Sequence, residues 1–490
     1  MLDRIFKLGK EAAVYGLSSI IGRFLNFLLV PFTTNFLTTA QYGVYSNIYA
    51  YIAFAFVIYG YGMDSAYMRF VSSAADSEKK QTLSIPLLSL LLTSFLFTVF
   101  IHFNASAISG AIGSSGYANL VQYSAWILFF DTSVIVPFAY LRMTNRAKLF
   151  ASLRIINIVI NVVLTIVMLM VFSLKLEAVF IANLVASAAT ALMLAWIILP
   201  QLTTKLSGSL FKEMLKFGLP YIPAGLAGIA IQVIDRPIVL ALTNEKTLGI
   251  YQANYRLGVL MMLFVGMFDY AWRPFFLTHA RDADAPKLFS KVFTYLMALL
   301  LFVFVGGTFF VEDIVRIRFF GHYFIHPNYW SGLSIVPIVL SAYVFTGAYV
   351  NFVVGVYLEK KTKFLPYATG AGAIVNVVVN LILIPILGIT GAAIATLLSY
   401  MVMALGIYFP SQRLYHVDYE WGRLVRLVLA AAIAVMPVLA MHPEPATLGG
   451  LAVKSGFTLL FIVLIFAFKV FDGADVRETR EALSKMFVRS

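Results

Sequence analysis

Apolar segments long enough to cross a lipid bilayer recur at fairly even intervals along this chain, and they limit its fold more than any other feature. A helix of about 20 apolar residues spans the hydrocarbon core of a membrane. The composition agrees, because 61% of the 490 residues are hydrophobic and 12% are charged, whereas soluble proteins average roughly 45–50% and 25%. So little charge cannot cover a soluble protein of this size. We therefore predict an all-α integral membrane protein.

The apolar segments predict about fourteen transmembrane helices. The first segment is longer than the apolar region of a signal peptide, which has about 7–15 residues, and the thirteenth is the shortest. The expected spans are residues 11–39, 43–69, 83–103, 118–141, 151–172, 177–198, 217–241, 249–273, 289–310, 332–358, 364–387, 391–410, 426–441 and 449–469.

Lysine and arginine residues are unequally distributed between the two sides of these spans. With the N-terminus in the cytoplasm, 28 of the 36 basic residues fall in cytoplasmic segments and 4 in segments on the opposite side. Basic residues near the ends of spans favour the cytoplasm and determine orientation. Both termini are therefore predicted to be cytoplasmic. The net charge of +13 reflects this placement, so we expect no nucleic-acid partner.

Two segments outside the spans have recognisable patterns. The stretch 311–331 is the longest on the predicted external side and contains two histidines and Trp330, so we expect a structured loop there. The charged tail from Asp472 onward has apolar residues roughly on one helical face. This pattern predicts a short helix on the inner membrane surface.

The chain contains an internal repeat. The pattern P-x11-G-x-Y-x3-Y occurs twice with an offset of 206 positions, as Pro31, Gly43, Tyr45, Tyr49 and as Pro237, Gly249, Tyr251, Tyr255. A second pattern, N-x3-N, occurs at Asn157 and Asn161 and again at Asn376 and Asn380. Six spans separate the copies, so both copies have the same orientation. Parallel repeats predict two halves with a transport pathway between them.

This repeat divides the chain into five predicted regions. A cytoplasmic segment precedes two six-helix halves, which enclose a central cavity. Two further helices and an interfacial tail follow the halves. The regions are residues 1–10, 11–205, 206–410, 411–469 and 470–490.

Three stretches of the sequence resemble the multidrug/oligosaccharidyl-lipid/polysaccharide exporter superfamily. They are T-T-A-Q-Y-G-V-Y from Thr38, N-V-V-V-N-L-I-L-I-P from Asn376 and G-A-A-I-A-T from Gly391. The likeness is greatest to the polysaccharide-transporter branch, which implies helices arranged as six, six and two. It also implies a flippase in the bacterial cytoplasmic membrane. Such a flippase moves undecaprenyl-pyrophosphate-linked oligosaccharide units by alternating access, for surface polysaccharide such as the O-antigen of lipopolysaccharide.

The resemblance implies a transporter rather than an enzyme, with no cofactor or metal, driven by asymmetric binding or by an ion or proton gradient. The expected partners are the lipid-linked oligosaccharide, membrane lipids, and the polymerase and glycosyltransferases of the same pathway, with the chain acting as a monomer. Two alternatives stay open: an ion-coupled multidrug exporter of the same fold, and a non-transport membrane protein of glycan assembly. Drug exporters generally keep an acidic residue within the first helix, whereas this span offers Arg23 and, at its edge, Glu11.

Charged side chains within spans are costly and usually face a cavity or a partner. Arg23 lies near mid-membrane, and Arg236 and Arg256 lie at matching depths in consecutive helices. We predict that these three line a cavity for an anionic head group, because a guanidinium binds phosphate oxygens in pairs and stays charged. Alternatively, Arg236 pairs with Asp235 or extends outward to the interface.

Polar and aromatic residues of the repeat are candidates for binding the glycan by stacking and hydrogen bonding. The tyrosines among them could instead belong to the aromatic belt at the membrane interface. The candidates are Asn26, Tyr45, Tyr49, Gln232, Tyr251 and Tyr255.

Three carboxylates are candidates for ion coupling or for a gate. Asp131 lies near the middle of its span, where a lone carboxylate can bind and release a proton, or it pairs with an arginine. Asp64 and Asp269 lie near the cytoplasmic ends of their spans, followed by Arg69 and Arg273. The second pair has the i,i+4 spacing of a local salt bridge. Alternatively, both pairs form an inner gate.

A reporter fused after Ser490 tests the predicted topology. A cytoplasmic fluorescent reporter should be active there, and an alkaline phosphatase that requires the periplasm should be inactive, because an even number of spans keeps both termini on the basic side. The two activities are measured in the same host at matched protein abundance. An active phosphatase at Ser490 would contradict the topology.

Overall fold

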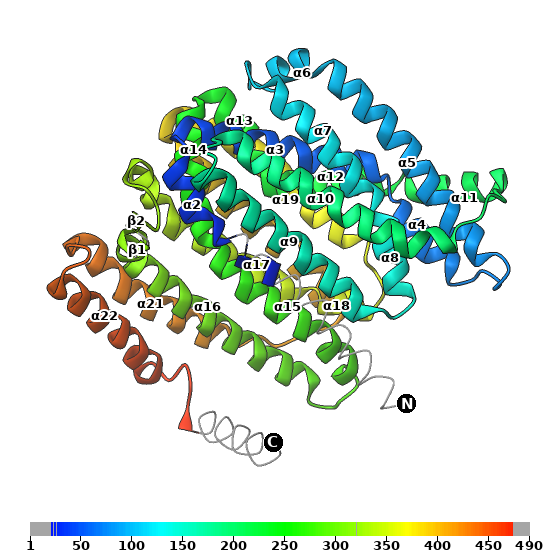
Figure 1. Cartoon of the computed structure of the whole chain (residues 1–490). Helices are drawn as coiled ribbons and strands as arrows, with labels where there is room; N and C mark the ends of the chain where they lie inside the picture. The colour runs from blue at the N-terminus through cyan, green and yellow to red at the C-terminus, as the bar shows by residue number, and fades with distance from the viewer. Residues whose placement is uncertain (1–20, 23, 26, 320, 474–490) are drawn as a thin grey trace.

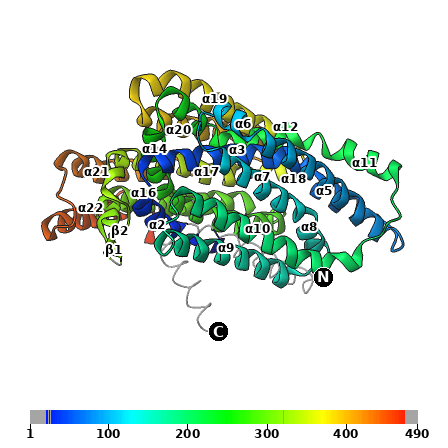
Figure 2. The same ribbon diagram turned by 45° about the horizontal axis from the view of Figure 1, so that its top comes forward.

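The computed structural model describes residues 21–473 except positions 23, 26 and 320 (Figure 1). The segment 1–10, the beginning of the first predicted span, the predicted tail helix and the candidate site residues Arg23 and Asn26 lie outside the described residues. Within this described part, the chain is a bundle of long helices that run alongside one another (Figures 1 and 2).

Thirteen helical segments among the described residues are long and apolar enough to cross a membrane. They correspond in order to the second through fourteenth predicted spans. The prediction of an all-α integral membrane fold is therefore confirmed. The count of fourteen stays a prediction, because the first span is described only in part.

The first predicted half contains both short and long helices. They are α2 (Leu29–Phe36), α3 (Thr39–Gly60), α4 (Met63–Val71), α5 (Lys79–Phe103), α6 (Ala105–Ala111), α7 (Ala118–Ser133), α8 (Ile135–Met143), α9 (Ala147–Met170), α10 (Leu176–Ile198) and the 3-10 helix η1 (Leu199–Gln201).

The rest of the chain adds helices and one small hairpin. The second predicted half contains α11 (Gly208–Gly218), α12 (Tyr221–Val233), α13 (Asp235–Leu242), α14 (Glu245–Tyr255), η2 (Arg256–Gly258), α15 (Val259–His279), α16 (Ala285–Arg316), β1 (Arg318–Phe319), β2 (His322–Tyr323), η3 (Pro327–Ile335), α17 (Val336–Phe352), α18 (Val354–Leu358), α19 (Phe364–Leu387) and α20 (Ile389–Leu414). The last two helices are α21 (Trp421–Met441) and α22 (Leu448–Ala467).

Several predicted spans are interrupted, which the pattern of apolar residues did not reveal. The span predicted at 217–241 is divided into α12 and α13 and is preceded by α11, and η2 interrupts the one predicted at 249–273. Between α3 and α4, Tyr61 and Gly62 have positive φ angles of 27° and 72°. At such a break, neighbouring side chains point in directions that a continuous helix would not give them.

The two copies of the repeat meet where α3 crosses α14. Gly43 faces the backbone carbonyl of Glu245, and Gly249 faces that of Thr39. Because Glu245 follows Thr39 by 206 positions, the contact has the same offset as the repeat. A Cβ atom on either glycine would overlap the opposing carbonyl oxygen. Small residues permit such backbone contact between membrane helices.

The segment between α16 and α17 packs against α2 and the start of α3. It contains the antiparallel hairpin of β1 and β2, followed by η3. The Asn35 side chain donates a hydrogen bond to the Tyr323 carbonyl (2.7 Å), and the Tyr329 hydroxyl donates one to the Leu37 carbonyl (2.9 Å). The expected structured loop is therefore present, and it ties the second predicted half to the first.

Helices α21 and α22 lie beside α16 at one side of the bundle (Figures 1 and 2). Lys454 of α22 forms an ion pair with Asp313 of α16, and the two side chains are only 4% and 12% exposed. The same carboxylate accepts a hydrogen bond from the Ala446 N–H (2.7 Å). Lys454, which the sequence places within a span, is thus neutralised by a neighbouring helix.

Replacing Gly43 by alanine tests the α3–α14 crossing. Because the new Cβ would overlap a backbone carbonyl, Gly43→Ala should lower the stability of the folded protein by about 1–3 kcal/mol, as overpacking does, and should lower its thermal unfolding temperature. Gly370→Ala is the control: its Cβ meets nothing within 4 Å, and alanine favours the helix. Equal unfolding temperatures of the two purified variants would refute the crossing.

Candidate functional site

A cavity of about 470 Å³ lies between α3, α9 and α10 on one side and the break between α14 and α15 on the other. Its apolar lining includes Phe27, Val179 and Met262. Its polar lining consists of Tyr45, Tyr49, Asn157, Asn161, Asn183 and Arg256. Among the lining residues that the structure describes, Arg256 is the one that carries a charge.

Arg256 occupies the helix break η2 and is held by aromatic rings of α3. Its guanidinium donates a hydrogen bond to the Tyr45 hydroxyl (2.7 Å). The guanidinium carbon lies 5.1 Å from the centre of the Tyr45 ring and 5.4 Å from that of Tyr42. Cation–π contact and one hydrogen bond thus stabilise the charge, while the remaining donors of this five-donor group can bind another acceptor. The predicted site residues Arg256, Tyr45 and Tyr49 therefore lie together at this cavity.

A series of polar contacts leads from the cavity toward Asp131. The Asn183 amide donates to the Tyr49 hydroxyl (2.9 Å), and the Ser187 hydroxyl donates to the Asn183 side-chain oxygen (3.5 Å). Asp131 lies near Ser187 and Arg154, although the structure shows no direct hydrogen bond between Ser187 and Asp131 among the described residues. Ser187 has a single hydroxyl proton, which it can donate to only one oxygen at a time.

Arg154 is held chiefly by aromatic contacts. Its guanidinium carbon lies 4.5 Å from the centre of the Phe138 ring and 5.7 Å from that of Phe150. Within the described residues, no ion pair of 4 Å or less joins Arg154 to Asp131. The Asp131 carboxylate therefore has no tight arginine partner among the described residues, and the Ser187 hydroxyl lies near it.

Three asparagines in the cavity wall were not predicted as site residues. Asn157 donates a hydrogen bond to the Thr190 hydroxyl (2.9 Å), and Asn161 accepts one from Thr165 (3.4 Å). The N-x3-N repeat marks these two positions, but by itself the repeat indicates only that the two halves of the chain are related. In the other copy, Asn380 donates to the buried Asn376 (2.9 Å). For Asn183, the sequence carried no comparable signal.

Four other predicted site residues lie away from this cavity. Tyr251 donates a hydrogen bond to Asp235 (2.6 Å) in the buried interior of the second predicted half. Tyr255 packs against Tyr251 and Tyr343, with ring centres 5.6 and 6.4 Å apart. Arg236 has a buried Nε atom that makes no hydrogen bond with the described residues. Gln232 is exposed and donates to the carbonyl of Gly228 in its own helix (3.1 Å).

The two candidate gate carboxylates have different partners. Asp269 and Arg273 form the local salt bridge that their spacing predicts (2.7 Å). Asp64 lies 4.0 Å from Arg142 of α8, and among the described residues no ion pair joins it to Arg69. Within the described residues, no group of three or more His, Asp and Glu side chains could hold a metal ion.

These observations define a class: a helical membrane protein with a polar cavity between two groups of helices. Residues 8–278, more than half of the chain, match the family described as polysaccharide biosynthesis protein. The chain belongs to this family. No curated protein sequence matches it.

Solved structures share its fold. The lipid II flippase MurJ in an inward closed conformation aligns with a TM-score of 0.75 at 15% identity, over 93% of this chain and 97% of that one. An inward-facing multidrug resistance MATE family transporter of the MOP superfamily aligns with a TM-score of 0.61 at 14% identity, over 82% and 94%. A MOP superfamily transporter from Pyrococcus furiosus gives 0.57 at 14% identity, over 83% and 95%. The fold is thus that of MOP superfamily transporters.

Proposed function

We propose that this chain is a flippase that moves an oligosaccharide linked to undecaprenyl pyrophosphate across the bacterial cytoplasmic membrane for surface polysaccharide assembly. One observation carries the proposal: Arg256 is the sole charge among the described residues that line the cavity. A guanidinium binds phosphate oxygens in pairs, and a pyrophosphate offers several. Membership in a polysaccharide biosynthesis family and a fold shared with a lipid II flippase support a lipid-linked glycan as the cargo.

The cavity has separate surfaces for the two parts of such a substrate. The pyrophosphate binds the donors of Arg256 that the hydrogen bond to Tyr45 leaves available, with Arg23 as a second cation from the first helix. The sugars contact the tyrosine rings and the amides of Asn157 and Asn161, and Asn26 adds a further amide. Together these groups match an anionic head with polar hydroxyls attached.

Alternating access involves movement of the regions 11–205 and 206–410 relative to each other, with both termini in the cytoplasm and residues 411–469 alongside. The contact of Gly43 with Gly249 is the pivot. Tyr251 and Tyr255 repeat Tyr45 and Tyr49 at the offset of 206. They therefore line the cavity in the opposite state, together with the remaining predicted residues Gln232 and Arg236.

Asp131 couples this movement to a proton gradient through the direction of the Ser187 hydroxyl. When Asp131 is ionised, Ser187 donates to the carboxylate, and the Asn183 oxygen loses its donor. When Asp131 is protonated, it donates to Ser187, which then donates to Asn183 and orders the bond from Asn183 to Tyr49. Proton binding thus reaches the cavity through three side chains. Asp64 and Asp269 are assigned to the inner gate.

An ion-coupled multidrug exporter is the second candidate, favoured by the fold shared with MATE family transporters. A cationic drug would, however, meet the positive charge of Arg256 without a carboxylate among the described lining residues. The cargo of this cavity should therefore be anionic. Transport of a cationic dye, in the absence of any transport of lipid-linked oligosaccharide, would establish the exporter instead.

Substitution of Arg256 tests the cargo. Arg256→Ala should reduce flipping of a pyrophosphate-linked oligosaccharide in proteoliposomes by about 10- to 100-fold, the worth of a hydrogen bond to a charged group. Arg256→Lys should recover only part, because an ammonium lacks the bidentate geometry. Arg281→Ala, at an exposed loop residue, is the control. Undiminished flipping by Arg256→Ala at normal abundance would refute the proposed role.

Substitution of Asp131 tests the coupling. The amide introduced by Asp131→Asn would donate permanently to Ser187, as a protonated carboxyl does. This substitution should therefore abolish the response of flipping to an imposed pH gradient while keeping binding intact. Ser187→Ala should have the same effect, because it interrupts the same series. Flipping by purified protein is measured with and without the gradient. An unchanged gradient response in both variants would exclude this series as the coupling route.

A further inference from the structure

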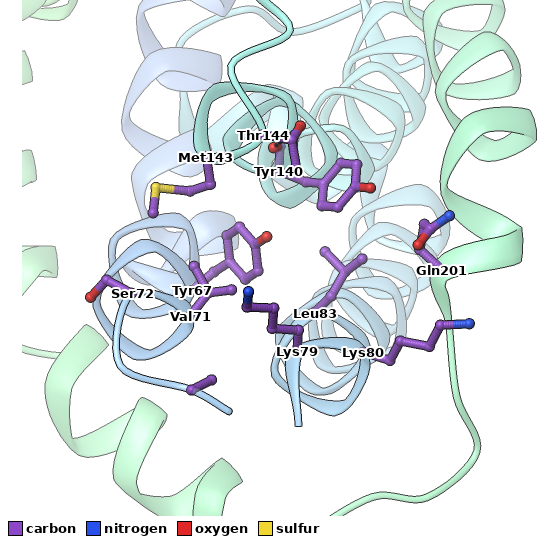
Figure 3. A pocket seen from close by; sticks show the side chains of 11 residues that line it. Tyr67, Val71, Ser72, Lys79, Lys80, Leu83, Tyr140, Met143, Thr144 and Gln201 are labelled. Carbon is purple, nitrogen blue, oxygen red and sulfur yellow. Dashed lines mark hydrogen bonds between the residues drawn. The ribbon is translucent and has the colours of Figure 1, made fainter. Parts of the chain in front are cut away.

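A second cavity, of about 440 Å³, lies beside the basic segments that follow α4 and α8. Figure 3 shows the side chains that line it. It is bounded by α4, by the first turns of α5, by the end of α8 and by η1. Its polar residues are Tyr67, Ser72, Lys79, Lys80, Tyr140, Thr144 and Gln201. It shares none of its lining residues with the cavity around Arg256.

An apolar groove of about 220 Å³ lies beside this cavity, between α5, α7, α8 and α10. Leu83 of the cavity and Leu87 of the groove lie one turn apart on α5, and Tyr140 and Pro137 are similarly close on α8. The groove is open to the surroundings, because Leu192 and Leu199 are 71% and 62% exposed. The two hollows therefore lie next to each other, the polar one outermost.

The dimensions of the pair agree with one leaflet of a bilayer. From Lys80 to Leu91, eleven residues along α5 rise about 16 Å, close to half of the roughly 30 Å hydrocarbon core. We propose that the cavity binds the phosphate head group of an anionic phospholipid and that the groove receives one of its acyl chains. The lipid comes from the leaflet next to the basic segments. This inference is independent of the proposed flippase activity.

The charges of the cavity explain the preference for an anionic head group. Lys79 and Lys80 open α5, which has no side-chain N-cap, so its first N–H groups and its dipole also favour an anion. Lys79 contacts Asp76, but this pair is exposed, at 53% and 94%, and such pairs contribute little. Lys80 donates to the Pro200 carbonyl (3.2 Å). Both ammonium groups thus keep donors for a phosphate.

Tyr67 provides a separate indication of a ligand. Its side chain is only 2% exposed, and the structure gives its hydroxyl no hydrogen-bond partner within the described residues. Figure 3 shows the Tyr67 ring extending into the space beneath Tyr140, close to Lys79. The ring is buried, but the hydroxyl oxygen is accessible from the cavity, so it can donate a hydrogen bond to a phosphate oxygen bound there.

Lipid binding to the full-length protein tests the proposal. Titration with phosphatidylglycerol in detergent, followed by native mass spectrometry and thermal unfolding, should show saturable binding. Phosphatidylcholine, which has the same chains but no net charge, should bind at least tenfold more weakly, and inorganic phosphate alone should not raise the unfolding temperature. Equal binding of both lipids, or equal stabilisation by phosphate, would overturn the proposal.

Variants separate the head-group cavity from the groove. Lys79→Gln with Lys80→Gln should weaken phosphatidylglycerol binding about 30-fold, and Tyr67→Phe, which removes only the hydroxyl, about 2- to 10-fold. Ala195→Phe, which fills the groove at an exposed position, should weaken it as well.

The matched control is Lys360→Gln with Lys361→Gln, an adjacent exposed lysine pair outside the cavity. It should bind phosphatidylglycerol as the parent protein does. If the control pair lost as much affinity as the cavity pair, attraction would be non-specific and the site would be refuted. If Tyr67→Phe and Ala195→Phe, folded as judged by unfolding temperature, both bound normally, the site would likewise be refuted.

Discussion

The backbone contact between α3 and α14 is the interaction on which the rest of this bundle depends. Helices in hydrocarbon gain little hydrophobic energy by meeting, so close packing and hydrogen bonds must hold them together. Gly43 and Gly249 remove the side chains that would separate the two backbones. The bonds from Tyr329 to Leu37 and from Asn35 to Tyr323 add to this contact from the segment between α16 and α17. The cavity around Arg256 lies beside the same crossing, because α3 and the residue that follows α14 both contribute to its wall.

The crossing also explains how an arginine is accommodated within the membrane-spanning region. A lipid-exposed guanidinium there would cost several kcal/mol. Arg256 comes shortly after Gly249 in the chain, and Tyr45 comes shortly after Gly43. The guanidinium of Arg256 therefore meets the hydroxyl of Tyr45 beside the crossing, at a distance of 2.7 Å. The rings of Tyr42 and Tyr45 cover the charge, and the cavity supplies a polar surface. A charge held in this way can bind an anion without a large rearrangement of the protein.

The short stretch from Thr38 to Tyr45 has four separate structural roles. Thr38 and Gln41 form a capping box that begins α3. Tyr42 packs edge-on against Tyr329, with ring centres 5.6 Å apart. Gly43 makes the crossing, and Tyr45 binds Arg256. In this stretch, one of the three that carry the family resemblance, about two turns of helix begin the span, close the interface and form the cavity wall.

The sequence by itself determined the membrane fold, the positions of the described spans and the repeat, because segment length and residue offset are local properties. It also singled out Arg256, Tyr45 and Tyr49. Only the tertiary structure decided which copy of the repeat lines the cavity. Tyr45 and Tyr251 are equivalent in pattern, yet one binds Arg256 and the other Asp235. The equivalent positions in the first copy, 206 residues before Arg256 and Asp235, hold the uncharged residues Ala50 and Leu29. The two copies of the repeat therefore differ in the charges that their tyrosines contact. Partners such as Asn183 and Tyr49 are 134 residues apart, and helix packing, rather than periodicity, brings them together.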